Sequence, residues 1–315
     1  MSNAPKPDAP KPDDTKHASA LTHAGSHFAP ISLALPSALA RQTRLDKLGP
    51  SHIPVLLAHP TWDPKSPGQS NSQSNSQSPG QSPVAPAPVC IWLHGRTVSK
   101  ELDNGRYLRW IRAGIAACAI DLPAHGERFE ADRQHSSRTL EIIAQVQHEI
   151  DEVLAGLADP RFAGAFDLSR VALGGMSLGG MITLRKLCDP AHPFCCAAVE
   201  STAGNLALMY KDRADKSGIA AADAMAHIEA WRPIPLLALH SQADAVVPVA
   251  CMSTFVDKLR EHYQSQHADP NAIAFHTWTA TGAPLEHNGF GKVAADAKTL
   301  QTDFLVKHLH AIAPV

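Results

Sequence analysis

One serine flanked by glycines, in GMSLGG at residues 175–180, constrains the fold of this chain more than any other feature. A strand-like run at 170–174 precedes this segment, and a helical run at 181–187 follows it. In that setting the sequence predicts a sharp strand-to-helix turn, which projects the serine hydroxyl above the carboxyl end of the strand. We therefore predict that Ser177 is a nucleophile and that the backbone N–H of Leu178 faces the same space. The alternative is a tight glycine turn that holds an inert serine.

Apolar runs of strand length alternate with helical patterns over most of the chain. Strands are predicted at 89–93, 115–120, 170–175, 195–200, 235–240 and 273–279, and helices at 136–158 and 291–310. For the first helix, Ser136 or Ser137 is the predicted N-cap and Asp159-Pro160 the predicted stop. This alternation predicts an α/β fold with a mostly parallel sheet that helices cover on both faces. Residues 30–60 are expected to add antiparallel entry strands.

The low-complexity segments suggest how the 315 residues are divided. Residues 1–28 are rich in Pro, Ala, Lys, Asp and His without periodicity, which predicts a disordered tail. Residues 66–82 contain only Ser, Pro, Gly, Gln and Asn, which predicts a flexible loop inserted between two strands of one sheet. Because 30–62 is too short to form a core alone, residues 29–315 are expected to form a single domain.

Charge and composition argue against several classes of protein. The 28 Lys and Arg residues against 30 Asp and Glu give a net charge of -2, unlike a strongly basic nucleic-acid-binding protein. No apolar stretch approaches the roughly 18 residues that a membrane span needs. The first residues lack the basic and then apolar pattern of a secretory signal, so we expect a cytoplasmic protein. The six cysteines are expected to be reduced and mostly buried, and His17, His23 and His27 are not expected to bind a metal.

A serine nucleophile needs a base, and the base needs an orienting acid. On a sheet of this kind the acid follows the serine in the chain and the base follows the acid. Asp244 lies just past the strand predicted at 235–240 and is the predicted acid. Glu200, just past the preceding strand, is the rival, and a helix-capping role for Asp244 is the alternative.

His287 is the predicted base, because a loop rich in glycine and proline can turn its imidazole back toward Ser177. The other histidines considered are less well placed: His276 within a strand, His308 and His310 on the final helix, and His240, which precedes Asp244.

The loop after the first central strand, which reads His94-Gly95-Arg96, is the predicted source of a second N–H donor for a developing oxyanion. The Arg96 N–H is the natural donor, since Gly95 lets the backbone approach a substrate. The alternative is a simple tight turn. We expect the Arg96 side chain to be solvated at the rim of the site; the alternative is a contact with an acidic group of a substrate.

These motifs together resemble those of the α/β-hydrolase superfamily from about residue 88 to the C-terminus. The segments LHGRTVSKEL at 93–102 and AIDLPAHGER at 119–128 are similar to bacterial dienelactone-hydrolase-like and prolyl-oligopeptidase-like esterases. The resemblance implies Ser177, Asp244 and His287 as a catalytic triad, with Leu178 and Arg96 at the oxyanion positions.

The same resemblance places Asp121, His125 and Gly126 in a loop beside the site, where we expect structural roles. The sequence departs from the pattern in two respects. The insertion at 66–82 is extra, and dienelactone hydrolases proper use a cysteine where this chain has Ser177.

Residues 203–232 lie where the superfamily carries a cap and are longer than one crossover helix requires. The apolar cap residues could line an acyl pocket or simply pack: Leu206, Leu208, Met209, Tyr210, Met225 and Trp231. A cap of this modest size suits a small ester better than a large lipid.

The sequence therefore predicts a serine hydrolase that cleaves short-chain carboxylic esters, a class of small-molecule substrate, without a cofactor or metal. Cleavage of a thioester or peptide, or acyl transfer, would use the same triad. A binding protein on an inactive hydrolase fold is the remaining alternative.

Overall fold

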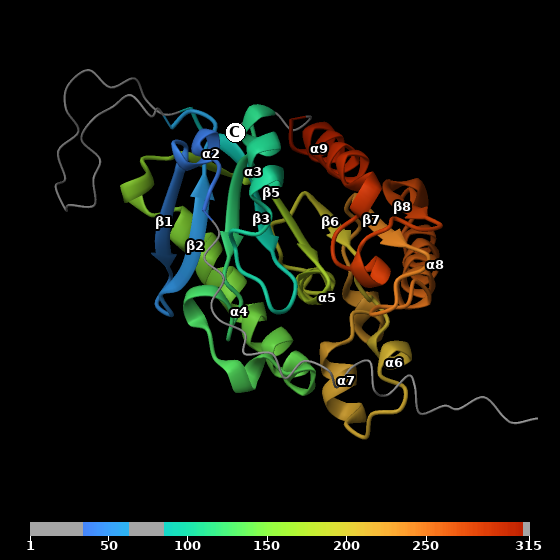
Figure 1. The fold of residues 1–315 in the computed structure, drawn as a ribbon. Coiled ribbons are helices and arrows are strands. Elements are labelled where there is room, and N and C mark those ends of the chain that lie inside the picture. Colours follow the sequence, from blue (N-terminus) through green and yellow to red (C-terminus); the bar gives the residue numbers. More distant parts are fainter. Residues whose placement is uncertain (1–33, 63–84, 311–315) are drawn as a thin grey trace, which may run out of the picture.

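A computed structural model describes residues 34–62 and 85–310. Strands from both ranges form one eight-stranded sheet (Figure 1). The strand order is β1-β2-β4-β3-β5-β6-β7-β8. The strands are β1 (Thr43–Leu48), β2 (Ile53–Ala58), β3 (Ala87–Leu93), β4 (Ala116–Ile120), β5 (Phe166–Met176), β6 (Cys196–Glu200), β7 (Leu236–Ser241) and β8 (Ile273–Trp278). The predicted tail at 1–28 and insertion at 66–82 lie outside the described residues.

The sheet is mostly parallel, as predicted. Strands β4, β3, β5, β6, β7 and β8 run parallel to their neighbours, whereas β1 pairs antiparallel with β2, and β2 antiparallel with β4. Both antiparallel strands come from the segment predicted to supply them. Strands β2 and β3, which flank the predicted insertion, belong to the same sheet.

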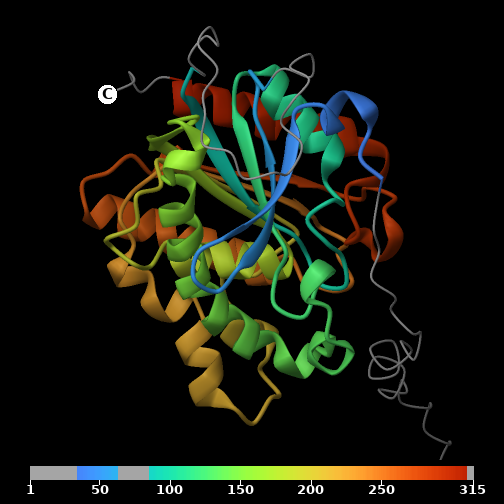
Figure 2. The same ribbon diagram turned by 90° about the vertical axis from the view of Figure 1, so that its left-hand side faces the viewer.

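Helices cover both faces of the sheet, which is why the central strands are continuous apolar runs. On one face α2 (Ser37–Ala40), α3 (Asn104–Arg112) and α9 (Ala294–His310) enclose a core around Trp92 and Trp110. On the other face α4 (Thr139–Leu157), α5 (Leu178–Lys186) and α8 (Ala250–Ser265) enclose a larger core. Figure 2 shows the sheet between these two layers.

The start of α4 corrects the predicted cap. Neither Ser136 nor Ser137 caps the helix; both belong to a 3-10 turn at Ser136–Arg138, and α4 begins at Thr139. The ring Nδ1 of His135 accepts hydrogen bonds from the backbone N–H and the hydroxyl of Ser137 instead. His135 thus caps the 3-10 turn, and the turn leads directly into α4, so the capping position falls one residue before the predicted serines. The helix ends at Leu157, just before the predicted stop.

The cap segment at 203–232 contains two short helices, α6 (Leu206–Met209) and α7 (Lys216–Ala222), and a 3-10 segment, η5 (Met225–Ala230). Asp223 ties it together by accepting hydrogen bonds from the N–H groups of Leu206, Ala207 and Met225 at 2.9–3.1 Å. Of the proposed pocket residues, Leu206 and Trp231 are buried in the core, so packing explains them. Leu208 is 39% exposed and remains available to a ligand.

All six cysteines are free thiols, five of them buried, as predicted. Within the described ranges, no helix is both long and apolar enough to cross a membrane.

Candidate active site

Ser177 occupies the strand-to-helix turn that its sequence predicts. It lies between the end of β5 and the start of α5 with φ 53° and ψ -115°, a conformation that residues other than glycine rarely adopt. Two contacts hold the strained residue: its N–H donates to the carbonyl of Glu200 at 2.9 Å, and Thr202 Oγ1 donates to its carbonyl at 2.7 Å. The neighbouring strand β6 therefore fixes the position of the hydroxyl.

The glycines around the serine are required by close backbone approach. A Cβ atom at Gly179 would overlap the carbonyl group of Leu93, and one at Gly175 would overlap the backbone of Gly179. The motif thus lets β3, β5 and α5 meet without side chains between them, which leaves the serine at the carboxyl edge of the sheet.

The structure brings the three predicted triad residues together from the ends of three strands. Ser177 Oγ lies 2.9 Å from Nε2 of His287, and Nδ1 of His287 lies 2.8 Å from Oδ2 of Asp244. Asp244 and His287 are 8% and 5% exposed, respectively. Because a carboxylate only accepts, Nδ1 of His287 carries the proton, and its Nε2 is free to accept the proton of the serine.

Asp244 is held as an ionised acceptor. Its Oδ1 accepts hydrogen bonds from the N–H groups of Val246 and Val247, both at 2.8 Å. Burial alone would raise the pKa of this carboxyl, but hydrogen bonds from His240, His287 and the backbone outweigh burial and lower the pKa to about 2. The predicted alternative, a helix-capping aspartate, does not describe these contacts, since α8 begins at Ala250.

The rival acid, Glu200, has a different partner. Its carboxylate forms a bidentate ion pair with the guanidinium of Arg106 at 2.7 and 2.8 Å and accepts a further hydrogen bond from Gln301. These groups connect β6 to α3 and α9. Glu200 therefore joins the sheet to its helices, and no histidine of the described residues bonds to its carboxylate.

The rival bases also lie elsewhere. His276 packs against Trp278, His308 packs against Phe304, and His310 contacts the carbonyl of Ala113. His240 is the exception, because its ring reaches Asp244.

Glu286, which the sequence analysis missed, shapes the loop that carries the base. Its Oε2 accepts hydrogen bonds from the N–H and hydroxyl of Thr281 and from Ser241 Oγ at 2.6–2.8 Å, and its Oε1 accepts from Gly282. The backbone hydrogen bond from Thr281, with these others, lowers the pKa of Glu286 to about 2. Leu285 and Glu286 both have positive φ, so the loop turns sharply just before His287. The position of this acidic residue directly before the predicted base is the sequence feature that could have pointed to it.

The two predicted oxyanion donors belong to segments that lie next to the serine. Leu178 is the first residue of α5, whose leading N–H groups lack helical acceptors. The loop after β3 approaches closely, since a Cβ on Gly95 would lie 3.6 Å from Cβ of Ser177. In the described ranges, neither Leu178 N–H nor Arg96 N–H donates to another residue.

His94 orients the peptide that carries the Arg96 N–H. Its Nε2 accepts the N–H of Leu122 at 3.1 Å, so Nδ1 holds the proton and donates to the carbonyl of Gly95 at 2.6 Å. In a trans peptide the C=O and the next N–H point in opposite directions. Fixing the Gly95 carbonyl therefore directs the Arg96 N–H away from His94.

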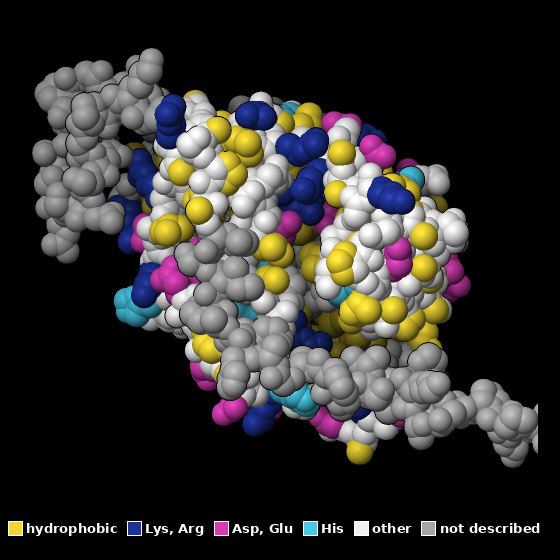
Figure 3. All heavy atoms as spheres, viewed as in Figure 1, with side chains coloured by type: hydrophobic (Ala, Val, Ile, Leu, Met, Phe, Trp, Pro, Cys, Tyr) yellow, Lys and Arg dark blue, Asp and Glu magenta, His cyan; other side chains and the backbone are white. Residues whose placement is uncertain are grey.

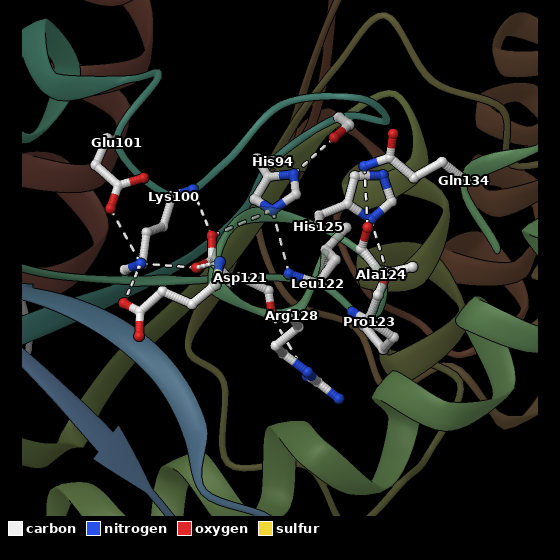
Figure 4. A network of polar contacts seen from close by, with 12 residues as sticks. His94, Lys100, Glu101, Asp121, Leu122, Pro123, Ala124, His125, Arg128 and Gln134 are labelled. Atoms are coloured by element: carbon white, nitrogen blue, oxygen red, sulfur yellow. Dashed lines mark hydrogen bonds and ion pairs between the residues drawn. The ribbon is translucent and has the colours of Figure 1, made fainter. Parts of the chain in front are cut away.

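Asp121 anchors this arrangement, as Figure 4 shows. It accepts hydrogen bonds from Lys100 N–H at 2.9 Å, Lys100 Nζ at 2.6 Å and Glu127 N–H at 3.0 Å. Gly126 has φ 54°, and a Cβ there would overlap the Asp121 carboxylate. The predicted structural roles of Asp121 and Gly126 are confirmed. The buried lysine that neutralises Asp121 has no signature in the sequence.

The Arg96 side chain corrects one prediction, because it is half-buried rather than solvated. It is close enough to Tyr210 and Arg213 of the cap to interact electrostatically, and burial lowers its pKa. Arg213 stacks on the Tyr210 ring at 4.5 Å and donates to the carbonyl of Ser136 at 3.1 Å. Figure 3 shows a recess beside the cap where hydrophobic and basic side chains lie together.

Acid should destabilise this protein in two steps. Burial lowers the pKa of both His94 and His125 from 6.5 to about 4, so their contribution is complete above pH 6.5 and is lost as the pH falls toward 4. The contribution of Asp244, about 2 kcal/mol, is complete above its ordinary pKa and is lost as the pH falls toward 2.

Urea unfolding at pH 7, 4 and 2 measures these steps. The free energy of unfolding should fall from each pH to the next, and His125→Asn should reduce only the fall between pH 7 and 4. A free energy of unfolding that is constant between pH 7 and 4 in the wild type would contradict the assignment of buried, neutral histidines.

The sheet, the strained serine turn and the arrangement of the triad define a protein of the α/β-hydrolase class. Residues 90–309 match the alpha/beta hydrolase family, and the chain belongs to that family.

Known proteins with similar sequence or structure include both esterases and peptidases by name. A Bacillus subtilis (strain 168) protein named "Putative esterase YitV" is 27% identical over 205 residues, 57% of this chain and 77% of that protein. TT1662 from Thermus thermophilus superimposes with a TM-score of 0.61 at 21% identity, covering 86% of this chain and 99% of that one. A puromycin-hydrolyzing peptidase from Mycobacterium tuberculosis gives a TM-score of 0.61 at 15% identity, covering 89% of this chain and 42% of that one. The two structural likenesses show the fold alone.

Proposed function

We propose that this protein is a serine hydrolase that cleaves short-chain carboxylic esters through an acyl-enzyme on Ser177. One observation carries the proposal: a hydrogen-bonded line runs from Ser177 Oγ through both ring nitrogens of His287 to Asp244, with distances of 2.9 and 2.8 Å. A serine hydroxyl is a weak nucleophile at neutral pH, and this line supplies the base and the orienting acid that it needs.

The reaction follows from the direction of these hydrogen bonds. As Ser177 Oγ bonds to the ester carbonyl carbon, Nε2 of His287 takes its proton, and the carbonyl electron pair moves onto oxygen. The Leu178 and Arg96 N–H groups stabilise that oxyanion. The carbon–oxygen bond to the alcohol then breaks, and the leaving oxygen takes the proton from His287. A water molecule repeats the sequence on the acyl-enzyme, which releases the carboxylic acid and regenerates Ser177. Asp244 stabilises the imidazolium in both halves.

Esters are favoured as substrates by the name of the Bacillus relative and by the size of the cap. The same triad would also cleave thioesters or peptides or transfer an acyl group, and a peptidase occurs among the structural neighbours. Comparing kcat/KM for p-nitrophenyl butyrate, butyryl-CoA and an alanine p-nitroanilide separates these activities. The proposal expects the ester to be hydrolysed fastest, with Ser177→Ala as the blank. Faster cleavage of the anilide would favour a peptidase over an esterase, and faster cleavage of the thioester would favour a thioesterase.

Chain-length selectivity should follow from the small cap. Each extra methylene of an acyl chain gains about 0.8 kcal/mol only where it finds buried apolar surface. Two of the apolar cap residues, Leu206 and Trp231, are already committed to the core. We expect kcat/KM on p-nitrophenyl esters to peak between acetate and butyrate and to fall by octanoate. A value that rises through decanoate, or a jump at an oil–water interface, would show that the cap encloses a long apolar groove.

A further inference from the structure

His240 is a buried histidine beside the triad that the mechanism above does not use. It lies near the carboxyl end of β7, four residues before Asp244, and its side chain is fully buried. Its Nε2 lies 2.9 Å from the carbonyl oxygen of Val247 and 3.4 Å from Oδ2 of Asp244. Both neighbours are acceptors, so Nε2 carries the proton. Within the described residues, its Nδ1 is buried and has no hydrogen-bond partner.

The imidazole of His240 therefore holds two parts of the acid loop at once. The N–H of Val247 donates to Oδ1 of Asp244, while its carbonyl accepts from His240. The ring closes this loop on the same carboxylate oxygen that accepts the proton-bearing Nδ1 of His287. Rotation of the Asp244 carboxylate would break contacts on both of its oxygens.

We propose that His240 is a positioning residue for ester hydrolysis: its Nε2–H binds the carbonyl of Val247 and lies beside Oδ2 of Asp244, which it holds in line with Nδ1 of His287. The same N–H weakens the stabilisation of the His287 imidazolium by that carboxylate. This inference rests on the proposed function of Ser177. The lowered pKa of Asp244 agrees with it, since after the opposing effect of burial the hydrogen bond from His240 is the largest influence on that carboxyl.

Other titratable groups near the pair have their own partners. From the loop after β8, Glu286 binds Ser241 and Thr281. From β6, Glu200 pairs with Arg106 of α3. Burial raises the pKa of the Cys251 thiol, at the start of α8, to about 11, so it stays protonated. A change in the hydrogen bonds of the acid loop should therefore affect His287 through His240 and not through these groups.

The test compares His240→Met with His240→Gln, which have similar length but differ in their N–H donor. Without the His240 N–H, Oδ2 of Asp244 should be less well aligned with Nδ1 of His287, which lowers kcat. The carboxylate should also stabilise the His287 imidazolium more strongly, which raises the acid limb. For p-nitrophenyl butyrate we expect His240→Met to lower kcat roughly tenfold and to raise the acid limb of the kcat/KM profile by about one pH unit, with KM little changed. His240→Gln should recover most of kcat and return the limb toward its wild-type position. In an Asp244→Asn background, His240→Met should cause no further loss, because its effect passes through the carboxylate.

His262 provides the matched control. It is also a buried histidine whose Nε2 donates to a backbone carbonyl, that of Trp231 at 2.9 Å, but it lies on α8 away from the triad. His262→Met should leave the acid limb unmoved. Thermal unfolding at pH 7 checks that each variant is folded. If His240→Met does not fold, His240→Asn takes its place, because the asparagine amide is too short to reach Oδ2 of Asp244.

Three results would overturn the inference. The acid limb of kcat/KM could shift equally in His240→Met and His262→Met. The loss of kcat could be equal in His240→Met and His240→Gln, or His240→Met could lower kcat further when combined with Asp244→Asn. Each of these leaves Ser177-dependent hydrolysis intact. Wild-type protein whose ester hydrolysis is unaffected by Ser177→Ala would instead remove the proposed function itself, and this inference with it.

Discussion

Replacing Ser177 by alanine is expected to lower kcat for p-nitrophenyl butyrate by about 10⁶-fold, the loss typical of removing a triad nucleophile. Alanine keeps the Cβ atom, so the strained turn with φ 53° is unchanged, and only the reacting oxygen is lost. The Leu178 and Arg96 N–H groups remain and should leave a residual rate of about 10³–10⁴ over water.

Initial rates and thermal unfolding on the same preparation separate lost chemistry from lost folding. Ser253→Ala, on α8, is the matched control, because the Ser253 hydroxyl contacts only the carbonyl of Ala250 among the described residues. Its activity should equal that of the wild type. A Ser177→Ala variant that keeps more than a few per cent of wild-type activity would place the nucleophile elsewhere.

Replacing Asp244 by asparagine is expected to lower kcat by about 10³–10⁴-fold with the fold intact. The N–H groups of Val246 and Val247 require an acceptor at the Oδ1 position, so the new amide oxygen should take that place. The amide NH₂ then faces Nδ1 of His287, which must accept rather than donate. Nε2 would carry the proton and could no longer receive the proton of Ser177.

Glu200→Gln is the comparison that distinguishes the two candidate acids. It weakens the buried ion pair with Arg106 and should lower the melting temperature. Its kcat should fall far less than that of Asp244→Asn, because Glu200 faces α3 and α9. If Glu200→Gln proves the more damaging change for kcat, the acid has been assigned to the wrong residue.

Much of the fold, and the meeting of Ser177, His287 and Asp244 at one edge of the sheet, could be predicted because each leaves a local pattern. The strands buried on both faces are continuous apolar runs, and GMSLGG leaves few conformations open to its serine. Asp244 and His287 could be found because parallel strands place the loops that follow them along one edge of the sheet.

The groups that support these residues could not be predicted, because their partners are distant in sequence. Lys100 gives no sign that it is buried against Asp121, 21 residues away. Pairing of Glu200 with Arg106 depends on how α3 packs. The capping error at Ser136 has a local cause: a 3-10 turn capped by the His135 imidazole precedes α4, which residue propensity alone does not reveal.

Labelling with a fluorophosphonate probe tests the central claim most directly, because the probe forms a covalent bond only with a serine activated by its base. Folded wild-type protein should gain one phosphonyl group, located by peptide mass spectrometry on Ser177. The label should be absent from Ser177→Ala and much slower to form in His287→Ala. No labelling of folded wild-type protein, or labelling of another residue that persists in Ser177→Ala, would contradict the account.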